Sequence, residues 1–152
     1  MWTIYQNVRC GVAMKEINSF DGEYKFLSNF FIHPIIWEGI LYPASENAFQ
    51  AMKTEDEEER VKFMHITPAK AKQKGRQLEL REGWDAIKIQ VMKNILTEKF
   101  HDRVLKKKLL DTHPVKLVEG NWWNDEFWGR CNGKGENWLG ILLMEVREDY
   151  RK

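Results

Sequence analysis

The sequence has few cysteines and no histidine cluster, and this limits the kinds of site it can form. Cys10 and Cys131 are its only cysteines, and its four histidines are scattered singly, with no pair at zinc spacing. Two isolated cysteines supply neither a disulfide framework nor a metal-ligand pattern. We therefore expect no metal site and no cofactor.

The sequence also lacks an excess of one charge and any long apolar run. Its 24 basic and 23 acidic residues give a net charge of +1, so nothing draws the whole molecule to nucleic acid or acidic membranes. No apolar run approaches the roughly 20 residues that span a bilayer, and no signal segment begins the chain. We therefore expect a cytoplasmic protein with no membrane partner. The oligomeric state stays open.

Repeats, low-complexity segments and linkers are absent as well, and 152 residues is the size of one domain. We therefore predict a single domain over residues 1–152, of the α+β class, mostly helical with a small β-hairpin. The hairpin is predicted at 35–42 around Glu38-Gly39, a strand at 115–119 and a loop at 120–135. Residues 1–14 show no clear periodicity and suit a short strand or an arm. Helices are predicted at 45–53, 54–65, 69–80, 85–100, 104–112 and from 137 onward.

Polar residues at the expected helix starts serve as predicted caps. Ser45 and Asp85 stand at the start of two of these helices, Thr67 precedes a third, and Asn137 opens the last one. Thr54 with Glu57 has the form of a capping box. Gly75 falls inside a predicted helix, where it costs about 1 kcal/mol relative to Ala, so a close approach or a ligand contact is expected there.

A helix beginning at Ser45 places Glu46, Gln50 and Lys53 on one stripe, at positions i, i+4 and i+7. A carboxylate, an amide and an amine in line can bind a polar ligand and move a proton. The same spacing also suits an ordinary solvated helix face, so the stripe alone does not distinguish a functional site from an exposed surface.

Seven tryptophans are present, four of them between residues 122 and 138. Flat aromatic walls beside polar groups suit a sugar or a heterocyclic base, although tryptophans also anchor cores. Glycines 129–135 before a helix, with Lys134 among them, can present backbone N–H groups to a phosphate, and such connections also occur without a ligand.

Three further polar residues have two interpretations each. Arg76 can bind a phosphate or carboxylate, or lie on a lysine-rich surface. Asn29, inside an apolar loop, needs a partner, which a ligand or a structural hydrogen bond can supply. Glu119 ends a predicted strand, which is a common place for functional-site residues, but it can also be a solvated residue of a turn.

An ordered series of motifs resembles the NADAR, or YbiA-like, family over residues 18 to 150. The series consists of Phe26-Leu27-Ser28-Asn29-Phe30, residues 42–53, Gly75-Arg76, Trp84, Lys99-Phe100, residues 116–119, Trp128-Gly129, Gly135, Asn137-Trp138-Leu139-Gly140 and residues 143–147. The resemblance implies a compact α+β fold and N-glycosidase activity. It implies a ribosyl or ADP-ribosyl substrate, either a riboflavin-pathway ribosylamino-pyrimidine phosphate or ADP-ribosylated guanine, including guanine in nucleic acid.

The resemblance also implies site residues. The catalytic candidates are Glu46 and Lys53. The substrate-binding candidates combine residues that match the family pattern with residues singled out in the preceding paragraphs. They are Asn29, Phe30, Gln50, Arg76, Trp84, Glu119, Trp128, Gly129, Lys134 and Asn137. Many relatives carry an acid where this chain has Arg130, and an arginine there favours a more anionic ligand.

Glu46 is expected to stabilise positive charge on the sugar and to activate water. Lys53 is expected either to act as a cation toward phosphate or the leaving base, or to attack the sugar and form a Schiff base. The alternative functions are a non-hydrolytic ADP-ribose or nucleotide-binding module and a structural protein with a tryptophan-rich core.

Overall fold

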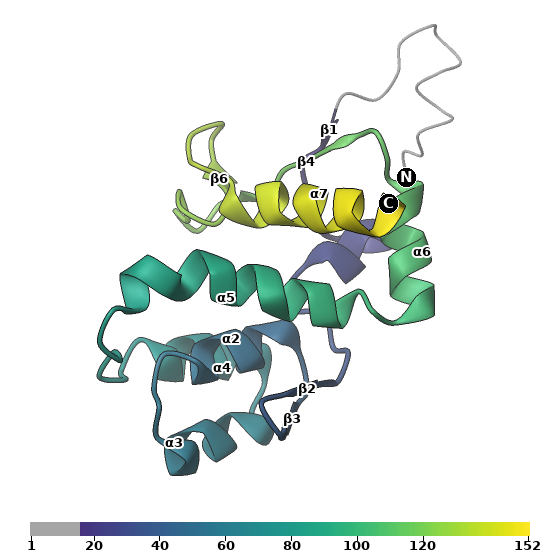
Figure 1. The fold of residues 1–152 in the computed structure, drawn as a ribbon. Helices are drawn as coiled ribbons and strands as arrows, with labels where there is room; N and C mark the ends of the chain where they lie inside the picture. The colour runs from purple at the N-terminus through teal and green to yellow at the C-terminus, as the bar shows by residue number, and fades with distance from the viewer. Residues whose placement is uncertain (1–15) are drawn as a thin grey trace, which may run out of the picture.

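The computed structural model describes residues 16–152, and the arm or strand predicted for residues 1–14 lies outside them (Figure 1). The helices are η1 (Gly22–Leu27), α2 (Ser45–Ala51), α3 (Glu57–Val61), η2 (Lys62–Met64), α4 (Pro68–Gly75), α5 (Trp84–Lys99), α6 (Arg103–Asp111) and α7 (Trp138–Arg151). The strands are β1 (Glu16–Ile17), β2 (Ile35–Trp37), β3 (Ile40–Tyr42), β4 (Lys116–Leu117), β5 (Gly120–Asn121) and β6 (Arg130–Cys131). The predicted α+β class, mostly helical with a small hairpin, is confirmed.

Helix α5 lies in the middle of the molecule. Figure 1 shows α7 on one side of it and α2, α3 and α4 on the other, and α5 packs against both α7 and α2. Its apolar side chains follow the helical period, so one stripe enters the core. The buried residues of α5 and α7 that form this core include Met92, Ile95, Leu96, Leu142, Leu143 and Val146. Among residues 16–152, no helix combines the length and the apolar character needed to cross a membrane.

The strands are short, and in the described part of the chain they pair only in twos. β2 and β3 form the predicted antiparallel hairpin around Glu38 and Gly39. The strand predicted at 115–119 is reduced to β4, which pairs in parallel with β1. The loop prediction for 120–135 was incomplete, because β5 pairs with β6 across it. These two pairings fix Glu119, which lies between β4 and β5.

Three predicted caps are wrong. Ser45 is the first residue of α2 rather than its cap. Asp56, not Thr54, caps α3, since its carboxylate accepts the N–H groups of residues 58 and 59. Asp85 lies inside the first turn of α5, which follows Gly83 in the left-handed region (φ 75°). The helix caps are instead the nearby residues Ala44, Asp56 and Gly83.

Gly75 is the last residue of α4, which ends five residues earlier than predicted. A Cβ atom at this position would lie 1.9 Å from Oε1 of Gln50. The predicted close approach is therefore confirmed. A larger residue here would force the Gln50 side chain to move.

Candidate active site

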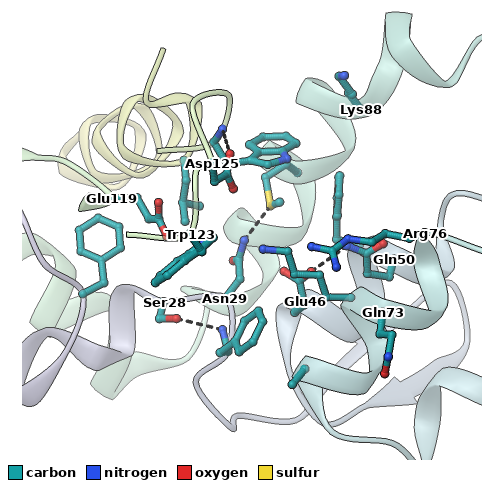
Figure 2. Close-up of a pocket in the computed structure, with 18 of the residues that line it drawn as sticks. Ser28, Asn29, Glu46, Gln50, Gln73, Arg76, Lys88, Glu119, Trp123 and Asp125 are labelled. Carbon is teal, nitrogen blue, oxygen red and sulfur yellow. Dashed lines mark hydrogen bonds between the residues drawn. The ribbon is translucent and has the colours of Figure 1, made fainter. Parts of the chain in front are cut away.

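A cavity of about 820 Å³ lies between these elements (Figure 2). Its walls come from the segment before β2, from α2, α4 and α5, and from the loop between β5 and β6. Nine of the twelve predicted site residues line it: Asn29, Phe30, Glu46, Gln50, Lys53, Arg76, Trp84, Glu119 and Trp128.

The polar stripe of α2 faces the cavity. Glu46 is buried, and Gln50 Nε2 donates a hydrogen bond of 2.7 Å to its Oε1. Gln50 Oε1 is buried against Gly75 and accepts no hydrogen bond from residues 16–152. Lys53 lies two residues beyond the end of α2 and is half-buried, yet its side chain still lines the cavity.

Burial changes the ionisation of both candidate catalytic groups. It raises the pKa of the Glu46 carboxyl, although the Gln50 hydrogen bond and the charges of Lys72 and Lys53 favour the carboxylate. Burial also lowers the pKa of the Lys53 amine, and the charges of Arg76 and Lys72 lower it further while Glu46 opposes the change. A larger share of Lys53 is therefore neutral, as a nucleophilic amine requires.

The loop before the hairpin fixes the start of α2. The backbone N–H of Glu46 donates to the Asn29 carbonyl at 3.0 Å, and Ser45 Oγ donates to Asn29 Oδ1 at 2.9 Å. Asn29 Nδ2 lies 3.4 Å from the Met92 sulfur. Asn29 thus holds Glu46 in place by structural hydrogen bonds and also lines the cavity.

Aromatic rings form the inner wall of the cavity. Phe49 packs between Trp84 and Trp128, with ring centroids 5.3 Å and 5.2 Å away. Such flat apolar surfaces suit the face of a base or the apolar side of a sugar.

Further aromatic rings lie at the mouth. Phe30, Trp122 and Trp123 are 41%, 84% and 45% exposed, and all three line the cavity. Lys72 Nζ lies 5.9 Å from the ring centroid of Phe30 and 5.8 Å from that of Trp123. Lys72 therefore connects two aromatic groups that come from distant parts of the sequence.

Three predicted site residues do not line the cavity. Gly129 and Asn137 instead pack against Glu119: a Cβ on Gly129 would lie 1.7 Å from Glu119 Oε2, and Asn137 Oδ1 accepts the N–H of Glu119 at 2.9 Å. Lys134 is exposed at the far turn between β6 and α7. The glycine-rich segment thus supports Glu119.

Arg130 also lies outside the cavity wall. Its Nε donates to the carbonyl of Gly135 at 3.3 Å. The side chain is used within its own loop, and the expectation that Arg130 favours a more anionic ligand stays a prediction.

Several lining residues were missed, notably Lys72, Lys88, Asp125 and Trp123. A signal for Lys72 was present, because it lies four positions before Arg76 and therefore on the same face of α4. Asp125 carried no such signal. Its Oδ1 accepts the N–H groups of Phe127 and Trp128, so it organises the loop on which it lies.

The cavity carries charges of both signs, because the carboxyl groups of Asp21, Glu46, Glu119 and Asp125 also line it. Four cationic side chains line it: Lys53, Lys72, Arg76 and Lys88. Over residues 16–152, no three His, Cys, Asp or Glu side chains are grouped so that they could hold a metal ion.

The model of the NADAR domain matches residues 17–151. The chain belongs to the NADAR family. The resemblance derived from the ordered motifs, over residues 18 to 150, is thereby confirmed.

Relatives of known name agree with this membership. The chain is 44% identical to N-glycosidase YbiA of Shigella flexneri serotype 5b (strain 8401), over 83% of this chain and 81% of that protein. It is 32% identical to a riboflavin biosynthesis protein of Vibrio vulnificus (strain YJ016), over 99% of this chain and 43% of that protein. An NMR structure of the Escherichia coli protein YbiA matches with a TM-score of 0.81 at 40% identity, over 92% of this chain and 88% of the other. The prediction that this NADAR protein is a glycosylase-type enzyme is confirmed.

Proposed function

We propose that this protein hydrolyses the N-glycosidic bond between ribose and base in a phosphorylated ribosyl or ADP-ribosyl base. The observation that carries the proposal is that Glu46 and Lys53 share one cavity with the aromatic rings of Phe49, Trp84 and Trp128. The N-glycosidase name of the relatives supports the reaction type.

The bound groups follow from the chemistry of the walls. The inner rings suit the base or the sugar, and the four lining cations suit phosphate oxygens. The Asn29 side chain, which lines the cavity, suits a sugar hydroxyl. The riboflavin biosynthesis name of the Vibrio relative favours a ribosylamino-pyrimidine phosphate. ADP-ribosylated guanine, free or in nucleic acid, satisfies the same cavity chemistry.

In the mechanism, breaking the ribose–nitrogen bond builds positive charge on the sugar ring. The Glu46 carboxylate stabilises this charge and accepts a proton from the attacking water. Burial raises the pKa of this carboxyl group, which makes the carboxylate a stronger base, while Gln50, Lys72 and Lys53 favour its ionised form. The low-dielectric surroundings strengthen both effects.

A hydrolysis screen by mass spectrometry tests the proposal. The purified protein is offered ribosylamino-pyrimidine phosphates, NAD-related compounds and ADP-ribosylated guanosine, and we expect release of the free base from at least one class. Binding without release would support the alternative, a non-hydrolytic ADP-ribose or nucleotide-binding module, and would reject the enzymatic proposal.

Lys53 is expected to form a covalent intermediate. Its amine replaces the base at the anomeric carbon, the base leaves with the bonding electron pair, and the sugar ring opens to give a Schiff base. Borohydride added during turnover should reduce this C=N bond and leave an adduct of the sugar mass on Lys53.

The two other lining lysines of α4 and α5, Lys72 and Lys88, serve as internal controls and should stay unlabelled in the peptide map. If turnover continues while no adduct is trapped on Lys53, the covalent route is rejected. Lys53 then acts as a cation only.

A further inference from the structure

Glu119 is a second carboxyl group in the cavity, and its backbone is held firmly. Its N–H donates to Asn137 Oδ1 at 2.9 Å, and its carbonyl accepts the N–H of Arg130 at 2.8 Å. Asn137 is 1% exposed and also donates to the Leu117 carbonyl at 3.0 Å. This anchoring fixes where the side chain enters the cavity.

The Glu119 carboxyl group is oriented as well. Asn121 Nδ2 donates to its Oε2 at 3.0 Å, and Gly129 packs against the same oxygen. No hydrogen bond from residues 16–152 reaches Oε1. One oxygen is therefore held by the protein, and the other is available to a ligand.

The charges around the two carboxyl groups of the cavity differ. In Figure 2, Glu119 and Asp125 lie on one side of the pocket and Glu46 on the other. Glu46 has the amide of Gln50 and the cations Lys72 and Lys53 nearby, with Asp125 as the opposing charge.

Glu119 faces the negative charges of Asp125 and Glu46, and Lys72 is the cation that opposes them. Burial is the largest cause that raises the pKa of Glu119 to about 7. The charges of Asp125 and Glu46 raise it further, while the hydrogen bond from Asn121 and the charge of Lys72 oppose the change. Burial raises the pKa of both carboxyl groups, and their surroundings differ in one neighbour: Lys53 favours the carboxylate of Glu46, whereas the charge of Glu46 favours the protonated form of Glu119. Two carboxyl groups that lie on opposite sides of one cavity and differ in this way can serve as a base and an acid.

We propose that Glu119 is the acid that protonates the nitrogen of the leaving base, with Glu46 as the base on the sugar side. This assignment rests on the proposed N-glycosidase function. As the ribose–nitrogen bond breaks, its electron pair goes to the base nitrogen, which takes the proton of Glu119. Water or the Lys53 amine supplies the new bond to the sugar carbon. Exchange with solvent then returns a proton to Glu119.

The test compares Glu119→Gln with Glu126→Gln, an exposed carboxyl group in the same loop. On the substrate that the screen identifies, wild-type kcat/KM should fall as the pH rises above about 7. Glu119→Gln should lower kcat about 100-fold, leave KM within about twofold and remove this alkaline limb. Glu126→Gln should match the wild type. A Glu119→Gln variant that keeps the alkaline limb, or that changes only KM, would overturn the proposal.

A second measurement needs no substrate. NMR titration of protein labelled with ¹³C at the glutamate carboxyl carbon should show one resonance that titrates near pH 7 and is missing from Glu119→Gln. Titration of that resonance below pH 5 would overturn the assignment of Glu119 as an acid, whatever the screen shows. If the wild type hydrolyses none of the substrates in the screen, the proposed N-glycosidase function is rejected. The NMR titration still shows whether Glu119 carries a proton near pH 7, independently of that result.

Discussion

Replacing Glu46 by Gln is expected to lower kcat about 10³-fold while ligand binding is largely kept. The substitution retains the size of the side chain, and its amide oxygen can still accept the hydrogen bond from Gln50 Nε2. It removes the negative charge that faces the sugar and the site that takes the proton from water. The loss therefore falls on the transition state more than on the bound substrate.

The measurement is kcat by mass spectrometry, together with the dissociation constant of the sugar product by calorimetry. Glu57→Gln is the matched control, because Glu57 is exposed in the first turn of the neighbouring helix α3, away from the cavity. If Glu46→Gln weakens binding as much as it slows turnover, Glu46 is a binding or folding residue and the mechanism is rejected.

The polar stripe was predictable from the sequence because it depends on one helical period. Glu46 and Gln50 lie one turn apart on α2, as their spacing requires. Lys53 shows the limit of the argument, because the helix ends at Ala51 and the lysine reaches the cavity from the turn that follows. Lys53 does line the cavity with Glu46 and Gln50, as predicted, but it does so from a turn and not from the helix itself.

The opposite wall could not be predicted from local pattern. Asp125 and Trp123 come from the loop between β5 and β6, and only the packing of this loop against the helices brings them to the cavity. The helical spacing places Lys72 on the face of α4 that carries Arg76, but it does not place that face at a cavity. The same holds for Gly129 and Asn137. The motif indicated that they belong to the site, but it did not indicate where they lie in the fold. They lie behind Glu119, and nothing in their spacing indicates that.

Lys99 is a buried charged group outside the cavity that affects stability. It is the last residue of α5, 2% exposed, and its Nζ donates to the Ser28 carbonyl at 2.9 Å. The rings of Phe31 and Phe100 lie 5.7 Å and 5.2 Å from Nζ. Within residues 16–152 no carboxylate forms an ion pair with it, and residues 1–15 contain no Asp or Glu.

Burial lowers the pKa of Lys99 to about 7 in the folded protein, from 10.5. Between these two values the unfolded chain binds a proton that the folded protein lacks, so the free energy of unfolding rises with pH. The destabilising cost is complete below about pH 7 and disappears above about pH 10.5. We expect the unfolding free energy of the wild type, relative to Lys99→Met, to rise by about 1 kcal/mol per pH unit between pH 7 and pH 9.

Urea unfolding of the wild type and Lys99→Met at pH 6, 7, 8 and 9 measures this difference, and taking the difference removes the contribution of every other titrating group. Lys25→Met, which changes an exposed lysine, should show no such slope. A wild-type minus Lys99→Met difference that stays constant with pH would mean that Lys99 keeps its proton in the fold. The consequence reaches the site, because Lys99 holds Ser28, and the next residue, Asn29, accepts the backbone N–H of Glu46. The protonation of a lysine outside the cavity is therefore linked to the stability of the loop that fixes the catalytic helix.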